Sequence, residues 1–238
     1  MTHTETEKQQ LRVVIVGHVD HGKSTLIGRL LHDTDSLPEG KYEELVETCK
    51  RRGTDALEWS FILDSFQAER DQAITIDTTQ IWFNTDLRDY VIIDAPGHRE
   101  FLKNMISGAS QADAAILVVD AKEGVREQTR RHAYLLHLLG LKQIAVVINK
   151  MDAIDYDQER FREISKDVTE YLASIHVTPK LILPISARNG DMISNRNKEL
   201  GWYEGPSLLE ALDHFQVPLP LQDLPLRFPV QDVYRHDE

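Results

Sequence analysis

The chain has 238 residues, which is enough for one sizeable α/β domain or for one domain and part of a second. Hydrophobic residues make up 41% and charged residues 28%, as in ordinary soluble globular proteins, and no apolar run approaches the roughly 20 residues that span a bilayer. The net charge of −12 argues against a broad phosphate-binding surface, so we expect neither DNA nor a membrane as a partner. A single cysteine, Cys49, and a polar N-terminus without a secretory signal fit a cytoplasmic protein.

The first half of the chain combines strands, helices and a hairpin. Residues 1–10 are expected to form a disordered tail, 11–16 a strand buried on both faces, and 26–31 a helix that follows a glycine-bearing loop. Residues 80–84 and 90–94 flank a polar turn, which predicts a hairpin and therefore one antiparallel strand. Two further helices are expected to bury Tyr42, Leu45, Val46 and Cys49, and then Trp59, Ile62, Leu63 and Phe66.

The second half alternates regularly between strands and helices. Strands are expected at 114–120, 143–149 and 180–185, and helices at 126–139, 158–172 and 207–215. This alternation predicts a mainly parallel six-stranded sheet with one antiparallel strand and helices on both faces.

The end of the chain differs in composition from the rest. Four prolines among residues 216–238 forbid a helix there, and 226–234 reads as one strand without a partner. We therefore expect an α/β domain over residues 11–217, followed at 218–238 by a linker and the first strand of a truncated β-barrel domain.

Residues 17–25 read GHVDHGKST, which satisfies the pattern G-x-x-x-x-G-K-[ST] between a predicted strand and a predicted helix. The glycines let the backbone wrap closely, so that N–H groups and the start of the helix face phosphate oxygens. Lys23 is expected to neutralise the β- and γ-phosphates, and the Ser24 hydroxyl to bind Mg²⁺. The loop residues predicted to bind a nucleotide are Gly17, His18, Val19, Asp20, His21, Gly22, Lys23, Ser24 and Thr25.

Selection of the base is predicted from the sequence NKMD at 149–152, directly after a buried strand at the edge of the sheet where ligands bind. The Asp152 carboxylate only accepts hydrogen bonds, and guanine offers N1–H and its 2-amino group as donors, whereas adenine offers a lone pair. Such a mismatch discriminates by about 10⁴. A helix-capping aspartate is the alternative interpretation of Asp152. At the next strand end, Ser186-Ala187-Arg188 could present a backbone N–H to the guanine oxygen, and the predicted base-binding residues are Asn149, Lys150, Asp152, Ser186 and Ala187.

Hydrolysis of the nucleotide is predicted from the sequence DAPGH at 94–98, also at a strand end. Asp94 is expected to hold magnesium through water, and the Gly97 amide to reach the γ-phosphate. His98 could orient the attacking water, or it could be a solvated histidine on a loop. Thr75 is a candidate second hydroxyl ligand to the metal, or a residue that simply opens a strand.

Together these segments resemble the translation-factor class of GTPases, from about residue 11 to the end. The resemblance implies the G-domain fold of P-loop proteins and hydrolysis of GTP to GDP with Mg²⁺. It also implies two switch segments, around Thr75 and after Asp94. Ala73 departs from the glycine that the family usually carries, and alanine would be costly there if φ were positive. The residues to which the resemblance gives catalytic roles are His98, Lys23 and Thr75, with Val19 and Ile74 as an apolar gate before His98.

The class includes elongation factor Tu, its archaeal and eukaryotic counterpart, and the GTPase large subunit of bacterial sulfate adenylyltransferase. STLIGRLLHDT, the short connection at 122–128 and LRFPVQDVY look most like the last of these, which works beside a separate adenylyltransferase catalytic subunit that makes adenosine phosphosulfate. The leading hypothesis is therefore the regulatory GTPase part of a sulfate adenylyltransferase. The alternative is an elongation factor, whose partners would be the ribosome or tRNA, because GHVDHGKST and the stretch after DAPGH look as much like elongation factors. A third hypothesis, motivated by Ala73, is a slow nucleotide-dependent binding module.

Overall fold

The computed structural model describes residues 8–54, 56–73, 80–94, 106, 109–217 and 225, with the side chains of 67–73 left aside. One six-stranded sheet runs through this part of the chain in the order β2-β3-β1-β4-β5-β6. The strands are β1 (Gln10–Gly17), β2 (Gln80–Asn84), β3 (Asp89–Asp94), β4 (Ala114–Asp120), β5 (Ile144–Asn149) and β6 (Leu181–Pro184). Only the β2–β3 pair is antiparallel among them, so the predicted fold class is confirmed.

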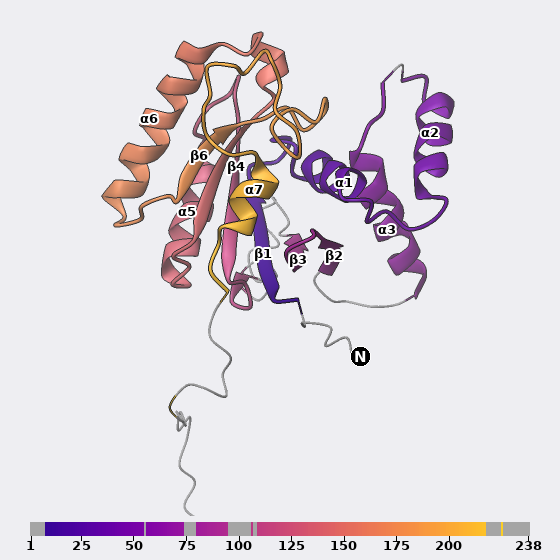
Figure 1. The fold of residues 1–238 in the computed structure, drawn as a ribbon, viewed down its shortest axis with the longest axis horizontal. Coiled ribbons are helices and arrows are strands. Elements are labelled where there is room, and N and C mark those ends of the chain that lie inside the picture. Colours follow the sequence, from indigo (N-terminus) through magenta and orange to yellow (C-terminus); the bar gives the residue numbers. More distant parts are fainter. Residues whose placement is uncertain are drawn as a thin grey trace, which may run out of the picture.

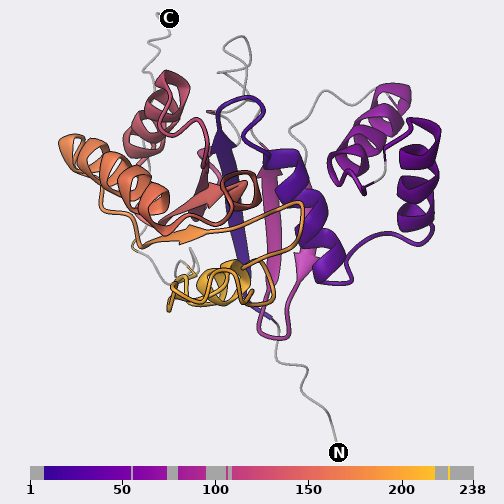
Figure 2. The ribbon, with the colours of Figure 1, turned by 90° about the horizontal axis from the view of Figure 1, so that it is seen from above.

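Helices cover both faces of the sheet: α5 and α6 lie on one face, and α1 and α7 on the other (Figures 1 and 2). The helices are α1 (Lys23–Asp33), α2 (Lys41–Arg51), α3 (Ser60–Ala73), α5 (Glu127–Leu138), α6 (Gln158–Ser174) and α7 (Leu208–Asp213). Side chains cap two of them, because Asp157 accepts from amides at the start of α6 and Ser207 does so at the start of α7. No helix in the described part of the chain is long and apolar enough to cross a bilayer.

The α2–α3 pair lies to one side of the sheet, where α2 packs beside α3 (Figure 1). Leu45 and Cys49 of α2 are buried as expected, but Tyr42 is 40% exposed, so its predicted inward position is wrong. Helix α2 packs beside α3 and not on the sheet, and its buried stripe is therefore narrower than that of a helix lying on a sheet. The strand expected at 226–234 lies outside the described residues.

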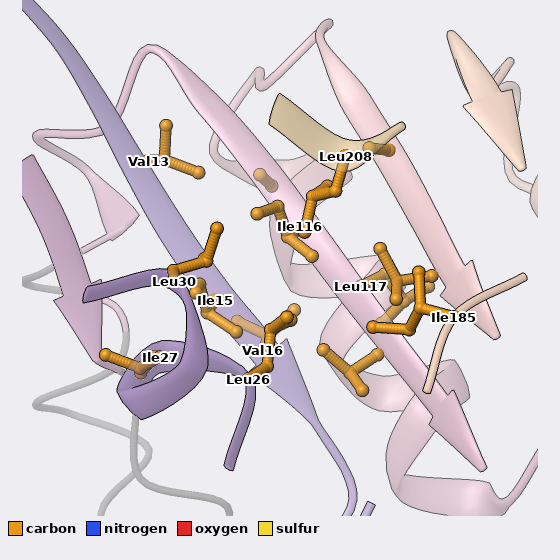
Figure 3. Packing of buried hydrophobic residues seen from close by; sticks show 14 of the residues in the cluster. Val13, Ile15, Val16, Leu26, Ile27, Leu30, Ile116, Leu117, Ile185 and Leu208 are labelled. Atoms are coloured by element: carbon orange, nitrogen blue, oxygen red, sulfur yellow. The ribbon is translucent and has the colours of Figure 1, made fainter. Parts of the chain in front are cut away.

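The core forms where α1 and α7 pack on the central strands (Figure 3). Leu26 and Leu30 of α1 lie against Ile15 of β1, and Leu208 of α7 lies over Ile116 of β4, all at 1% exposure or less. The buried central parts of β1, β4 and β5 are apolar, and a glycine or polar residue follows at the carboxyl end of each strand. Gly17, Asp94, Asp120 and Asn149 end β1, β3, β4 and β5, and the parallel register brings these ends to one edge of the sheet.

Candidate nucleotide-binding site

The phosphate loop connects β1 to α1, in the strand–loop–helix context that the sequence predicted. Gly22 precedes α1 with φ 88° and ψ 27°, a left-handed conformation that favours glycine. A Cβ atom at Gly22 would also collide with the Asn149 side-chain amide, so the loop packs directly against the end of β5. His18 and Val19 are half-buried, Asp20 is exposed, and His21 is completely buried. The first turn of α1 therefore points its amides into the loop.

Lys23 and Asp94 are half-buried charges that interact electrostatically at the edge of the sheet. The Lys23 ammonium donates to the Gly17 and His18 carbonyls, at 2.9 Å in each case. Burial lowers the pKa of Lys23, an effect that the negative charges of Asp94 and Asp20 oppose. Burial also raises the pKa of Asp94, against the charge of Lys23. Each charge is thus incompletely compensated, which suits a site that gains a phosphate group beside the lysine and a cation beside the carboxylate.

A magnesium ion fits the oxygen atoms gathered here. Ser24 and Thr25 lie in the first turn of α1 and are partly exposed, and Asp94 ends β3. Hydroxyl and carboxylate oxygens are the ligands that Mg²⁺ prefers, usually together with substrate phosphates and waters. A bound divalent cation would also stabilise the ionised form of the half-buried Asp94 carboxylate. Thr75, which we predicted as a further ligand, lies outside the described residues, as do Ile74, Gly97 and His98.

Asn149 joins the phosphate loop to the loop after β6. It is 1% exposed; its side-chain NH₂ donates to the His21 carbonyl at 2.9 Å, and its side-chain oxygen accepts from the Ala187 amide at 3.0 Å. The Ala187 amide, one of the three backbone N–H groups that could have faced guanine, is therefore bonded to Asn149. The Asn189 amide donates to Ser186 Oγ at 3.2 Å. The Arg188 amide has no acceptor among the described residues.

Asp152 is oriented by a side chain from the same loop after β6. The Ser186 hydroxyl donates to Asp152 Oδ1 at 2.6 Å, and no described residue donates to the other carboxylate oxygen. Asp152 belongs to a 3-10 helix, η2 (Met151–Ile154), that the sequence did not predict, and the residue that caps η2 is Lys150, with φ 64°. Asp152 is therefore not an N-cap residue, and one of its oxygens is available to a ligand.

Lys150 forms an ion pair that no sequence motif indicated. Its ammonium lies 2.7 Å from Asp120 Oδ2, and Asp120 is itself 3% exposed at the end of β4. Burial alone would raise the pKa of Asp120, but the Lys150 hydrogen bond and the amides of Glu123 and Lys122 outweigh it and lower that pKa. The signal that could have found Asp120 is its position: it is an acidic residue ending the strand next to β5.

Three histidines lie close together at the phosphate loop, two of them within the loop itself. The His18 and His21 ring centroids are 5.1 Å apart, His18 Nδ1 lies 2.9 Å from the Gln128 side-chain oxygen, and His21 Nδ1 lies 3.2 Å from the Val118 carbonyl. Burial lowers the pKa of His21, an effect that the Val118 carbonyl and the charge of Asp120 oppose. His132 of α5, which sequence reasoning missed, is 5% exposed, and its Nδ1 has no partner among the described residues. Burial, followed by the charges of Lys23 and the other two histidines, lowers the pKa of His132 to about 4.

Ala73 ends helix α3, where the backbone is right-handed and helical. Alanine is favourable in that conformation. The energetic cost that alanine would carry at a positive φ therefore does not arise in this structure.

The sheet order, with a phosphate loop after β1 and polar loops after β5 and β6, defines a P-loop nucleotide-binding domain. Residues 8–218 match the family model of the elongation factor Tu GTP binding domain. The chain belongs to this family of GTP-binding domains, whose members are GTPases.

Curated relatives and solved structures agree with that family. The chain is 48% identical over 231 residues to elongation factor 1-alpha of Thermococcus onnurineus and of Pyrococcus abyssi, covering 96% of this chain and 53% of each relative. The chain thus spans about half the length of the curated relatives it matches. Among solved structures, Sup35 complexed with GMPPNP aligns with a TM-score of 0.61 and 30% identity, covering 88% of this chain and 45% of that one. The Ski7 GTPase-like domain of S. cerevisiae bound to GTP, at 20% identity and a TM-score of 0.69, shares the fold over 91% of this chain and 52% of that one.

The interpretation as a sulfate adenylyltransferase subunit is not supported by these comparisons. It depended on the short connection at 122–128 and on the segment that ends the chain. The connection is a tight turn closed by the Asp120 side chain, which accepts from the Lys122 and Glu123 amides. Most of the final segment lies outside the described residues. The curated relatives reported above are instead elongation factors, which favours the other branch of the class.

Proposed function

We propose that this chain is the GTP-binding part of a translation factor that carries aminoacyl-tRNA, or a related cargo, to the ribosome. The observation that supports this most strongly is the 48% identity to elongation factors 1-alpha over 96% of the chain. The residues after 217 would then lead into the β domains that make up the rest of the protein.

The arrangement of charges supports separate binding sites for the phosphates, the magnesium ion and the base. Lys23 and the amides of the phosphate loop would bind the β- and γ-phosphates, and Ser24 and Asp94 would hold Mg²⁺, which neutralises charge on the phosphates when bound. Asp152 would accept from the guanine N1–H and 2-amino groups, while Asn149 keeps the two loops of the site at a fixed separation. Thr75 would be a second hydroxyl ligand to Mg²⁺, the Gly97 amide would reach the γ-phosphate, and His98 would orient the attacking water.

In this proposal, hydrolysis of GTP would limit how long the cargo stays bound. The segments around Thr75 and after Asp94 would be ordered by contacts to the γ-phosphate and its magnesium, and released when that phosphate leaves. His98 would orient the water that attacks the γ-phosphate, behind the apolar side chains of Val19 and Ile74. The cargo would then be bound only while GTP is intact.

Ribosomes are expected to accelerate GTP hydrolysis by the full-length protein at least ten-fold, from an unstimulated rate of about 10⁻⁴ to 10⁻² per second. Single-turnover hydrolysis with and without ribosomes measures this. His98→Ala should abolish the acceleration, and His214→Ala, at an exposed histidine directly after α7, should not.

A rate unmoved by ribosomes would contradict the translation role. If ATP, sulfate and an adenylyltransferase subunit raised the rate instead, the sulfate-activation hypothesis would replace it. Equal hydrolysis by His98→Ala and the unmodified protein would support a passive binding module.

A further inference from the structure

The backbone carbonyl of Arg188, in the loop after β6, accepts hydrogen bonds from two distant parts of the chain. The Trp59 indole N–H donates to it at 3.2 Å, and the Arg29 guanidinium donates at 3.4 Å. Trp59 precedes α3 and Arg29 lies on α1, so both donors come from outside the sequence motifs that predicted the base site. Arg188 directly follows Ser186 and Ala187, which contact Asp152 and Asn149.

The Trp59 indole has little freedom to move. Trp59 is 3% exposed, the Arg29 guanidinium lies 5.2 Å from its ring centroid, and the His32 ring lies 4.5 Å from it. A Cβ atom at Gly28 of α1 would collide with the Trp59 carbonyl, so the backbones of α1 and Trp59 are in direct contact. The orientation of the indole N–H is therefore set by α1, the helix that begins at the phosphate loop.

Arg29 also packs on the far side of the same loop. Its Nε lies 2.7 Å from Asp33 Oδ1, which fixes the guanidinium plane, and a Cβ atom at Gly190 would collide with that guanidinium. The Gly190 amide in turn donates to the Ser186 carbonyl at 2.8 Å, which closes the loop. The loop is thus held on its inner side by Asn149 and on its outer side by Arg29 and Trp59.

We infer that Trp59 and Arg29 are positioning residues for the base-binding loop at 186–188. They set the orientation of the Arg188 peptide and, through it, the loop that carries Ser186 against Asp152. This inference rests on the proposed role of that loop in binding guanine. The inference predicts that GTP affinity depends on Trp59, a residue that lies outside the phosphate-binding and base-binding motifs.

Trp59→Phe in the full-length protein tests the inference, because phenylalanine keeps an aromatic ring but lacks the N–H donor. The dissociation constant for GTP should rise about five-fold, the equivalent of one hydrogen bond of about 1 kcal/mol. The single-turnover hydrolysis rate at saturating GTP should not change, because the loop contacts the base and not the γ-phosphate. Arg29→Gln removes the other side-chain donor to the Arg188 carbonyl and should also raise the dissociation constant for GTP. A rise in both variants would show that the effect does not come from misfolding of the tryptophan variant.

Tyr171→Phe is the matched control, since it removes a side-chain hydrogen bond of 2.8 Å to the Arg130 carbonyl between α5 and α6. Its GTP affinity should equal that of the unmodified protein. The inference is overturned if Trp59→Phe binds GTP as tightly as Tyr171→Phe, or if its saturated hydrolysis rate falls in parallel with affinity. If Asp152→Asn weakens GTP binding while Trp59→Phe does not, only this inference fails; if neither does, the base site itself is wrong.

Discussion

Replacing Asp152 with asparagine is expected to weaken GTP binding by about 10²- to 10⁴-fold and to improve the binding of xanthosine triphosphate. The Ser186 hydroxyl holds one carboxylate oxygen at 2.6 Å, which leaves the other oxygen to accept from the base. An asparagine NH₂ at that place would face the guanine N1–H and 2-amino donors and leave them unpaired. Xanthine has an oxygen at position 2, which can accept from the new amide.

Equilibrium titration of the Asp152→Asn protein with both triphosphates measures this exchange of preference. Asp155→Asn is the matched control, because Asp155 is exposed three residues further on and its φ of 52° suits asparagine. It removes the same charge and should leave both affinities unchanged. If Asp152→Asn bound GTP as tightly as the control, the proposed recognition of guanine would be wrong.

The folded domain is expected to lose about 2 kcal/mol of stability between pH 7 and pH 5 through His132 alone. The pKa of this buried histidine is lowered to about 4, against an ordinary value of 6.5 in the unfolded chain. Between these two values the unfolded state binds a proton that the folded state does not, so stability falls as the pH falls. Above pH 6.5 the ring is neutral in both states and the effect disappears.

Urea unfolding of the nucleotide-free protein at pH 7 and pH 5 measures the loss. His132→Asn should flatten the dependence by about that amount, whereas His176→Asn, at an exposed histidine, should leave it unchanged. His21 is also buried with a lowered pKa, so some pH dependence should persist in the His132 variant. Identical slopes in the two variants would contradict the burial argument.

Most of the fold was predictable because the strands and helices carry clear periodicity. The predicted strand at 114–120 coincides with β4, and most other predicted boundaries fall within a few residues of the observed ones. The antiparallel β2–β3 pair followed from the polar turn between its strands. Tyr42 was misplaced because burial on a helix depends on what covers it, and α2 lies to one side of the sheet.

The site was predictable only where its residues form a contiguous motif. The phosphate loop and Asp152 could be found in this way. The Lys150–Asp120 pair, His132 and the contact of Trp59 with the Arg188 carbonyl could not, because each joins segments far apart in the chain. The Arg188 carbonyl is moreover a backbone group, which carries no signal in the residue type. The bond that occupies the Ala187 amide likewise depends on how close β5 and the loop after β6 lie.

Calorimetric titration of the protein with GTP and with ATP, each with magnesium present, tests the central claim most directly. A phosphate loop closed by Lys23, beside a carboxylate at Asp152 that only accepts hydrogen bonds, predicts tight binding of GTP and at least a hundred-fold weaker binding of ATP. Equal affinity for the two nucleotides, or no binding of either, would contradict it.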